Sequence, residues 1–279
     1  MAEYKAIKGQ TIQNRTSDPL VAGTANGSWA SAPNLNTGRG SGGSGGPATS
    51  AIVAGGQDPS TDYAASAASF DGSSWTAAPN LNEGRTEPGG FATSSSSAIF
   101  AGGYTTASPA GVRATVEQYD GSSWSEVSNL NKERTSCMGT SYGTTTAGAI
   151  AGAVDGGSPG TNLQLMEYWD GSSWSEQADL NLGRRDAGGA GTQTACILGA
   201  GMGGSPYPGT ITNNTETWNG SAWTEVAEMN NSLRAFAGSF GTSTAAIFAG
   251  GGPPPNADTE YYDGTSWTEI GNMSAARYS

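Results

Sequence analysis

Residues 117–130 read Glu-Gln-Tyr-Asp-Gly-Ser-Ser-Trp-Ser-Glu-Val-Ser-Asn-Leu, and versions of this stretch recur along the chain with a period of about 50 residues. Its Asp-Gly step favours the positive φ angles of a tight β-hairpin, and the residues after it alternate between polar and apolar as a half-buried strand does. The repeat therefore predicts an all-β domain. The tryptophan that marks each copy stands at Trp29, Trp75, Trp124, Trp174, Trp223 and Trp267.

Each copy contains two further segments with the composition of strands. One is an apolar run that ends in glycine, such as Ala98-Ile-Phe-Ala-Gly-Gly, and the other is a stretch of small residues before it, such as Gly89-Gly-Phe-Ala-Thr. With the hairpin they make four antiparallel strands, a to d in chain order, and such sheets repeated around an axis form a β-propeller. We expect the small residues of strand a at the crowded centre and the large aromatic residues in the gaps between blades.

An arginine follows the tryptophan in every copy, and a glutamate lies on strand c in most of them. A residue that recurs in every blade has a structural role in the blade, so we expect these side chains to pair or to cap backbone groups within and between blades. A ring of arginines that binds anions is the functional alternative. The arginines are Arg39, Arg85, Arg134, Arg184, Arg234 and Arg277, and the glutamates are Glu117, Glu167, Glu216 and Glu260, with Ala68 in the first full copy.

The Gly-Gly doublet, the aromatic-Asp step and the tryptophan at this period resemble the kelch repeat, from about residue 24 to residue 279. The sequence Tyr-Asp-Gly-Ser-Ser-Trp-Ser-Glu also resembles repeats in the kelch-like structural proteins of marine bacteriophages, cyanophages especially. The opening from Glu3 to Asn14, followed by Ser17-Asp-Pro, resembles the leader of such virion proteins. The resemblance implies a kelch-like β-propeller at residues 23–279, an anchoring arm at residues 1–22, a place at the surface or tail of the virion, and other virion proteins as partners.

The copies do not add up to a whole number of blades. Five complete a–d copies run from Arg39 to Arg277, and one further strand d, around Trp29 to Leu35, precedes them. We expect this strand to belong to a split sixth blade whose strands a, b and c come from residues after 279 or from a partner. A closed five-bladed ring with the Trp29 segment stacked outside it is the alternative.

Composition excludes several classes of function. The net charge is −12 with few Lys and Arg, and such a surface repels the phosphates of nucleic acids. No apolar run approaches the roughly 20 residues that span a bilayer, and the N-terminus lacks the apolar core of a Sec signal peptide. We therefore expect no nucleic-acid partner and no membrane insertion.

The chain offers few residues of the types that catalyse reactions. The chain has no His, which removes the commonest general base and the commonest metal ligand. No Cys cluster has zinc spacing, and the Asp-Gly turns lack the series of ligands that calcium needs. We expect no catalytic residue, metal or cofactor. Cys137 and Cys196 occupy different phases of the repeat, and we interpret them as small buried or half-buried free thiols, with a disulfide left open.

The connections between strands b and c differ most from copy to copy. Because strand direction alternates, they lie with the d–a connections on one face of the disc, and their side chains suit sugar or protein surfaces. Tolerated loop insertions are the alternative interpretation. The candidate binding residues are Asp58, Tyr63, Tyr104, Arg113, Asp155, Asn162, Tyr207, Asn213, Asn256 and Asp258.

These observations predict a non-enzymatic phage virion protein of the tail or fibre type. Its propeller would present the loop face to a host-surface glycan, a host protein or another virion protein, within a multi-subunit assembly. A purely structural scaffold or docking subunit is the first alternative, and a carbohydrate-active enzyme is the second.

Overall fold

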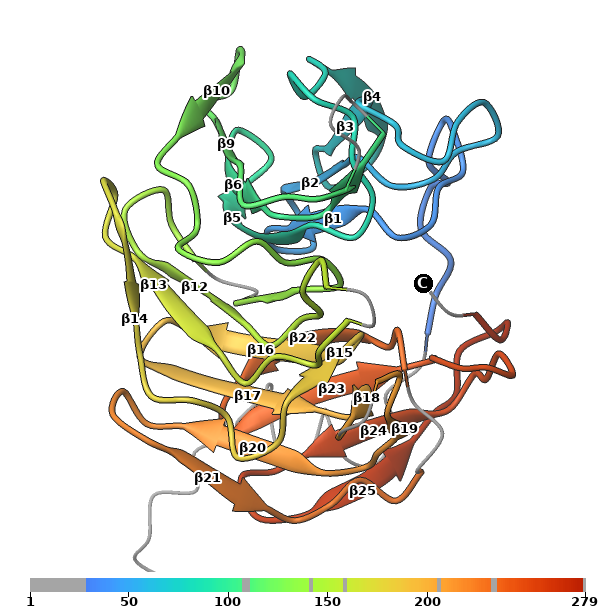
Figure 1. Ribbon diagram of the computed structural model, residues 1–279. Helices are drawn as coiled ribbons and strands as arrows, with labels where there is room; N and C mark the ends of the chain where they lie inside the picture. The colour runs from blue at the N-terminus through green and yellow to red at the C-terminus, as the bar shows by residue number, and fades with distance from the viewer. Residues whose placement is uncertain are drawn as a thin grey trace, which may run out of the picture.

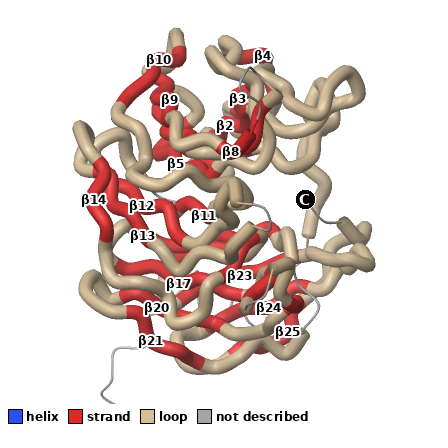
Figure 2. Tube along the Cα trace, viewed as in Figure 1, coloured by secondary structure: helices blue, strands red, loops and turns tan. Residues whose placement is uncertain are grey.

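The computed structural model describes residues 29–106, 111–140, 143–157, 160–204, 207–231 and 235–277, and within them every regular element is a strand (Figure 2). Five antiparallel sheets of four strands follow one another around a common centre, from the top of Figure 1 through its left side to the bottom. This arrangement is a kelch-like β-propeller. No helix in the described ranges is long and apolar enough to cross a membrane.

The five blades contain strands a to d in chain order, as expected. Blade 1 contains β1 (Gly43–Gly45), β2 (Ala51–Ala54), β3 (Ala67–Phe70) and β4 (Trp75–Ala78). Blade 2 contains β5 (Gly89–Ser94), β6 (Ser97–Ala101), β9 (Val116–Tyr119) and β10 (Trp124–Val127). Blade 3 contains β11 (Met138–Gly139), β12 (Gly148–Ala151), β13 (Met166–Trp169) and β14 (Trp174–Glu176).

The last two blades repeat this order. Blade 4 contains β16 (Gly188–Thr192), β17 (Ala195–Gly199), β20 (Thr215–Trp218) and β21 (Trp223–Val226). Blade 5 contains β22 (Gly238–Thr242), β23 (Ala245–Ala249), β24 (Thr259–Tyr262) and β25 (Trp267–Ile270). Two small sheets decorate the loops, namely β7 (Tyr104–Thr105) with β8 (Gly111–Val112), and β15 (Arg184–Arg185) with β18 (Met202–Gly203) and β19 (Thr210–Ile211).

The c–d hairpin forms because its turn satisfies its own backbone. Asp120 Oδ1 accepts hydrogen bonds from the N–H groups of Ser122 and Ser123, each at 2.8 Å, and Gly121 takes a φ of 96°. Tyr119 then pairs across the hairpin with Trp124, with the rings stacked 4.9 Å apart. The same turn begins at Asp71, Asp170, Asn219 and Asp263.

Strand a requires small residues, as predicted, because neighbouring blades approach closely at the centre. A Cβ atom placed on Gly139 would lie 1.9 Å from the carbonyl oxygen of Gly90 in the preceding blade. One on Gly45 would lie 2.6 Å from the backbone nitrogen of Ala92. Only glycine fits at such distances.

The hydrophobic core is divided among the interfaces between blades. In the first interface, Ile52 and Leu81 pack with Phe100 and Trp124 of blade 2. Equivalent clusters join blades 2 and 3, blades 3 and 4, and blades 4 and 5. Each cluster includes the tryptophan of the following blade, so Trp124, Trp174, Trp223 and Trp267 fill the gaps between sheets. Trp75, in the first blade, is only half-buried, and Trp29 is 40% exposed.

The segment from Trp29 to Leu35 corrects one expectation, because it forms no strand. A strand d needs a neighbouring strand c for its backbone hydrogen bonds, and none of the described residues provides one here. Trp29 nevertheless contacts blade 5, where its Nε1 donates to Thr259 Oγ1 at 3.1 Å and its ring lies 6.4 Å from that of Phe240. Cys137 is half-buried and Cys196 buried, and both are free thiols.

Candidate functional site

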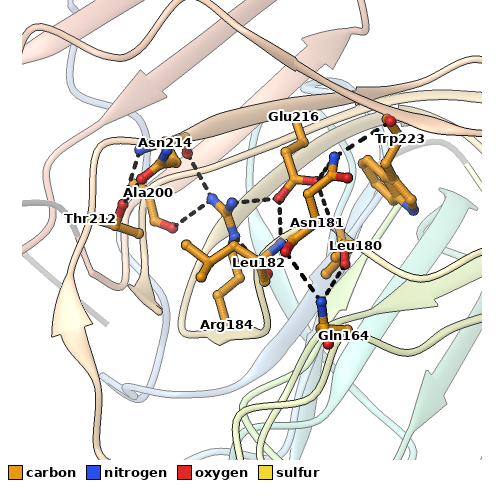
Figure 3. A network of polar contacts seen from close by, with 10 residues as sticks. All are labelled: Gln164, Leu180, Asn181, Leu182, Arg184, Ala200, Thr212, Asn214, Glu216 and Trp223. Carbon is orange, nitrogen blue, oxygen red and sulfur yellow. Dashed lines mark hydrogen bonds and ion pairs between the residues drawn. The ribbon is translucent and has the colours of Figure 1, made fainter. Parts of the chain in front are cut away.

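Three of the repeated arginines, Arg85, Arg134 and Arg184, and all four repeated glutamates are buried inside the fold. Arg184 Nη2 donates to Glu216 Oε1 at 2.6 Å, and Nη1 donates to the carbonyl of Asn214 at 2.7 Å (Figure 3). Glu216 Oε2 also accepts from the backbone N–H of Asn181 at 2.8 Å. Each such Arg–Glu pair therefore joins a d–a connection to strand c of the following blade. Equivalent pairs are Arg85 with Glu117 and Arg134 with Glu167.

The other copies depart from this pattern. Arg39 faces Ala68 instead of a glutamate, and its Nη1 donates to the carbonyls of Gly55 and Ser66 at 2.9 and 2.6 Å. Arg234 lies outside the described residues, although Glu260 accepts from the N–H of Asn230 at 2.7 Å. Burial lowers the pKa of Arg85 and Arg184, and their glutamates oppose that effect. These arginines therefore serve the interfaces between blades.

The acidic candidates in the b–c loops have partners within the protein, and two of them stabilise their own loops. Asp58 and Asp155 accept hydrogen bonds from backbone N–H groups, as turn residues do. Asp258 accepts from two asparagine side chains. The partners are Ser60 and Thr61 for Asp58, Gly157 and Thr161 for Asp155, and Asn231 and Asn272 for Asp258.

The cationic and amide candidates also have internal partners. Arg113 pairs with Glu83 at 3.3 Å. Asn162 Nδ2 donates to the carbonyl of Gly204 at 2.9 Å and so connects the loop of blade 3 with that of blade 4. Asn213 Nδ2 donates to Glu228 and to the carbonyl of Met229, and Asn256 exchanges backbone hydrogen bonds with Gly251 and Arg277.

The aromatic candidates form two separate groups. Tyr63 and Tyr104, from neighbouring blades, lie with their rings 5.8 Å apart. Tyr207 is 41% exposed, and the guanidinium of Arg185 lies 5.1 Å from the centre of its ring. The candidate residues are thus spread over five loops and do not converge on one site.

A different set of residues converges at the centre of the same face. The residue two positions after each of the first five repeated arginines lines the hub, and its backbone adopts the left-handed conformation. The five positions and their φ angles are Ser41 (55°), Glu87 (55°), Ser136 (57°), Asp186 (55°) and Phe236 (57°). Non-glycine residues rarely adopt this conformation, and such strain is concentrated at functional sites.

Backbone hydrogen bonds connect these five residues from blade to blade. Glu87 N donates to the carbonyl of Ser41 at 2.7 Å, and Ser136 N donates to that of Glu87 at 3.0 Å. The series continues through Asp186 to Phe236. We call these five residues the hub ring. Its backbone is uniform, whereas its side chains differ from blade to blade.

The hub ring lines a cavity of about 330 Å³ on the loop face, together with Arg39 and Pro88. Glu87 Oε2 accepts from Ser136 Oγ at 2.5 Å, and Asp186 Oδ2 accepts from Arg185 Nη1 at 2.5 Å. Burial raises the pKa of Asp186 to about 6, Arg185 opposes this, and the negative charge of Glu87 adds to it. The hub ring thus gives the cavity two carboxylates, two hydroxyl groups and an aromatic ring.

The hub ring was missed by the sequence analysis, although a signal was present. The criterion that variable positions carry function was applied only to the b–c loops. Aligning the copies on their arginines shows a column, two residues later, that changes among Ser, Glu, Asp and Phe. In the described ranges, no group of three or more Cys, Asp or Glu residues is placed to hold a metal ion.

Comparison with known proteins supports the architecture. No family model matches the chain, and no curated protein matches it. A solved structure described as "Structure of YjhT" is similar, with a TM-score of 0.72 and 14% identity over 88% of this chain and 88% of that chain. At this identity the likeness shows the fold alone, and the fold of this chain is a kelch-like β-propeller.

Proposed function

We propose that this chain is a non-enzymatic virion component of a bacteriophage, of the tail or fibre type, and that its propeller binds a host-surface glycan through the loop face. The observation that carries the proposal is the contrast between two sets of side chains. The uniform Arg–Glu pairs are buried between blades, whereas the variable hub ring lines an open cavity. Variation directed at a cavity is what a binding site requires.

The chemistry of the hub cavity suits a sugar. The carboxylates of Glu87 and Asp186 accept hydrogen bonds, which sugar hydroxyl groups donate. Phe236 contributes an aromatic face, on which the C–H face of a sugar ring packs. The virion assignment rests on the resemblance of the repeat to phage kelch-like proteins. The proposed anchoring arm at residues 1–22 lies outside the described residues.

Host adsorption provides the test. Purified protein should bind host cells and compete with the phage for adsorption. The Glu87→Gln and Asp186→Asn variants should bind more weakly, by about tenfold each for one charge-assisted hydrogen bond. Glu133→Gln is the matched control, because Glu133 is exposed in a d–a connection and does not line the hub cavity. Unchanged adsorption in both hub variants would reject the glycan site.

One observation favours a carbohydrate-active enzyme as the second candidate. Asp186, with a pKa of about 6, lies in the same cavity as Glu87, and glycoside hydrolysis uses an acid and a base of this kind. Assays of the purified protein on host polysaccharides separate the two proposals. Release of reducing sugar that disappears in Asp186→Asn would establish the enzyme and overturn the non-enzymatic function.

A further inference from the structure

We propose that the cleft between blade 5 and blade 1 is a docking site for a three-stranded antiparallel β-element of a separate polypeptide. This element supplies strands a, b and c of a sixth blade, and residues 29–35 become its strand d. Its strand a carries small residues, its strand b aliphatic residues, and its strand c a glutamate that pairs with Arg277. The proposal does not depend on the ligand of the hub cavity.

Blade 5 exposes the surface that other blades bury against their successor. Phe240 is 43% exposed, whereas Phe91 and Ala190, at the same register position of strand a, are fully buried. Ile247 is half-buried, although its equivalents Ile99 and Ile197 are fully buried. A cavity of about 430 Å³ lies against this surface, lined by Trp29, Phe240, Ala249, Met273 and Arg277 among others.

The backbone of Arg277 makes the same hydrogen bond as that of a buried repeated arginine, but its side chain is exposed. Its carbonyl accepts from Gly251 N at 2.9 Å, as that of Arg85 accepts from Gly56 N at 2.7 Å. The side chain of Arg85 is 1% exposed and pairs with Glu117 on strand c of the following blade. Arg277 is exposed and pairs with no carboxylate of the described residues. The missing group is therefore a glutamate on the next strand c.

The opposite wall of the cleft, formed by blade 1 and the segment before it, also has features of an interface with a sixth blade. Asn36 Nδ2 donates to the carbonyl of Trp75 at 3.2 Å, as Asn82 Nδ2 donates to that of Trp124 at 3.2 Å. The segment around Asn36 thus makes the side-chain contact with blade 1 that a d–a connection makes with the blade that follows it. Trp29 precedes Leu35 by the same number of residues as Trp75 precedes Leu81. The chain thus contains the segment that would form strand d and the connection that follows it, and strands a to c remain to be supplied.

The four existing interfaces indicate what covers the cleft. Each of them buries one sheet face against another through an aliphatic strand b and the tryptophan of strand d. Trp29 already contacts Phe240 in this manner. A second copy of the chain does not offer such an element, because its a–c strands already pair with their own strand d. A separate three-stranded element continues the same interface.

A synthetic polypeptide with the sequence of residues 86–120 is the probe, since it contains strands a to c of blade 2, Glu117 and no tryptophan. We expect it to bind the intact protein one to one, raise its Tm and shift its tryptophan fluorescence to shorter wavelength. The shift should be absent in Trp29→Phe. Arg277→Gln in the protein, or Glu117→Gln in the probe, should weaken binding about 100-fold, and both together no further. Arg113→Gln in the probe is the control, and the affinity of this probe for the protein should be unchanged.

The same experiment can overturn the proposal. Binding that is insensitive to Arg277→Gln would do so. If the free probe does not bind, it is appended after Ser279 through a Gly/Ser linker, and an unchanged Tm of that fusion would reject the site. A protein that dimerises, with Phe240→Ser restoring the monomer, would make a second copy the occupant. Much tighter probe binding after deletion of residues 1–22 would make that arm the occupant.

Discussion

Arg134 and Glu167 form an ion pair from which solvent is fully excluded, and it joins the connection between blades 2 and 3 to strand c of blade 3. The guanidinium also donates to the carbonyl of Leu165 at 3.3 Å, and Glu167 accepts from the N–H of Asn131 at 2.8 Å. The pair therefore satisfies backbone groups of the connection and of blade 3 at once. Removing one partner leaves the other charge buried without compensation.

This relationship predicts the stability of single and double variants. Glu167→Gln and Arg134→Met should each lower the free energy of unfolding by about 3–5 kcal/mol, because an isolated buried charge is costly. The double variant Arg134→Met with Glu167→Gln should lose less than the sum of these two single variants. Urea denaturation measures all three.

The matched control is the surface pair of Lys132 with Asp155, whose ammonium and carboxylate lie 3.7 Å apart. Lys132→Gln should cost less than about 1 kcal/mol, as exposed pairs do. Additive losses in the double variant at Arg134 and Glu167 would contradict the coupling.

The first blade offers the reverse experiment. Arg39 is already held in the connection to blade 1, and Ala68 occupies the position of the missing glutamate on β3. Ala68→Glu should stabilise the protein by about 1–2 kcal/mol, because a charged acceptor is added to an existing cation. Denaturation of Ala68→Glu and of the neutral control Ala68→Gln decides the point. Equal stability of the two variants would show that the added charge finds no partner.

Much of the fold could be predicted from the sequence because the repeat encodes local chemistry. The Asp-Gly turn, the small residues of strand a and the tryptophan each act through near neighbours, and six copies reveal them. The prediction of a strand at Trp29 to Leu35 was wrong because a strand also needs a neighbouring strand for its hydrogen bonds, and the local sequence does not show whether one is present. The loop candidates Asp58 and Asp155 use their oxygens in their own turns, and sequence does not show how a carboxylate is satisfied. The hub ring depends on which residues surround the axis, and this follows only from how the five blades are arranged in space.

The hairpin turns predict how the protein responds to acid. Hydrogen bonds from the residues two and three positions later hold the pKa of Asp120 at about 2, and Asp71, Asp170 and Asp263 share this value. Because the folded-state pKa lies below the ordinary value of 3.8, these groups stabilise the fold above pH 4 and lose that contribution as the pH falls toward 2.

The turn of blade 4 provides a natural control, since Asn219 accepts the same hydrogen bonds without titrating in this range. A variant with all four aspartates changed to asparagine should lose less stability between pH 4 and pH 2 than the unmodified protein does. Thermal unfolding at a series of pH values measures this. Parallel curves for both proteins would contradict the role of the turns.

Asp186 predicts a separate response at higher pH, with the opposite sign. Burial raises its pKa in the folded protein to about 6, above the ordinary value of 3.8, so the folded state holds this proton more tightly than the unfolded state does. Stability should therefore fall as the pH rises from about 4 to about 6. A difference of this size corresponds to a penalty of up to about 3 kcal/mol above pH 6.

Asp186→Asn removes the charge while keeping an oxygen acceptor for Arg185, so it should stabilise the protein at pH 7 and leave it unchanged at pH 4. Urea denaturation at both values measures the effect, with the exposed Asp62→Asn as the control. A constant offset at both values would show that the variant acts through packing, because ionisation of Asp186 is linked to folding only within this window.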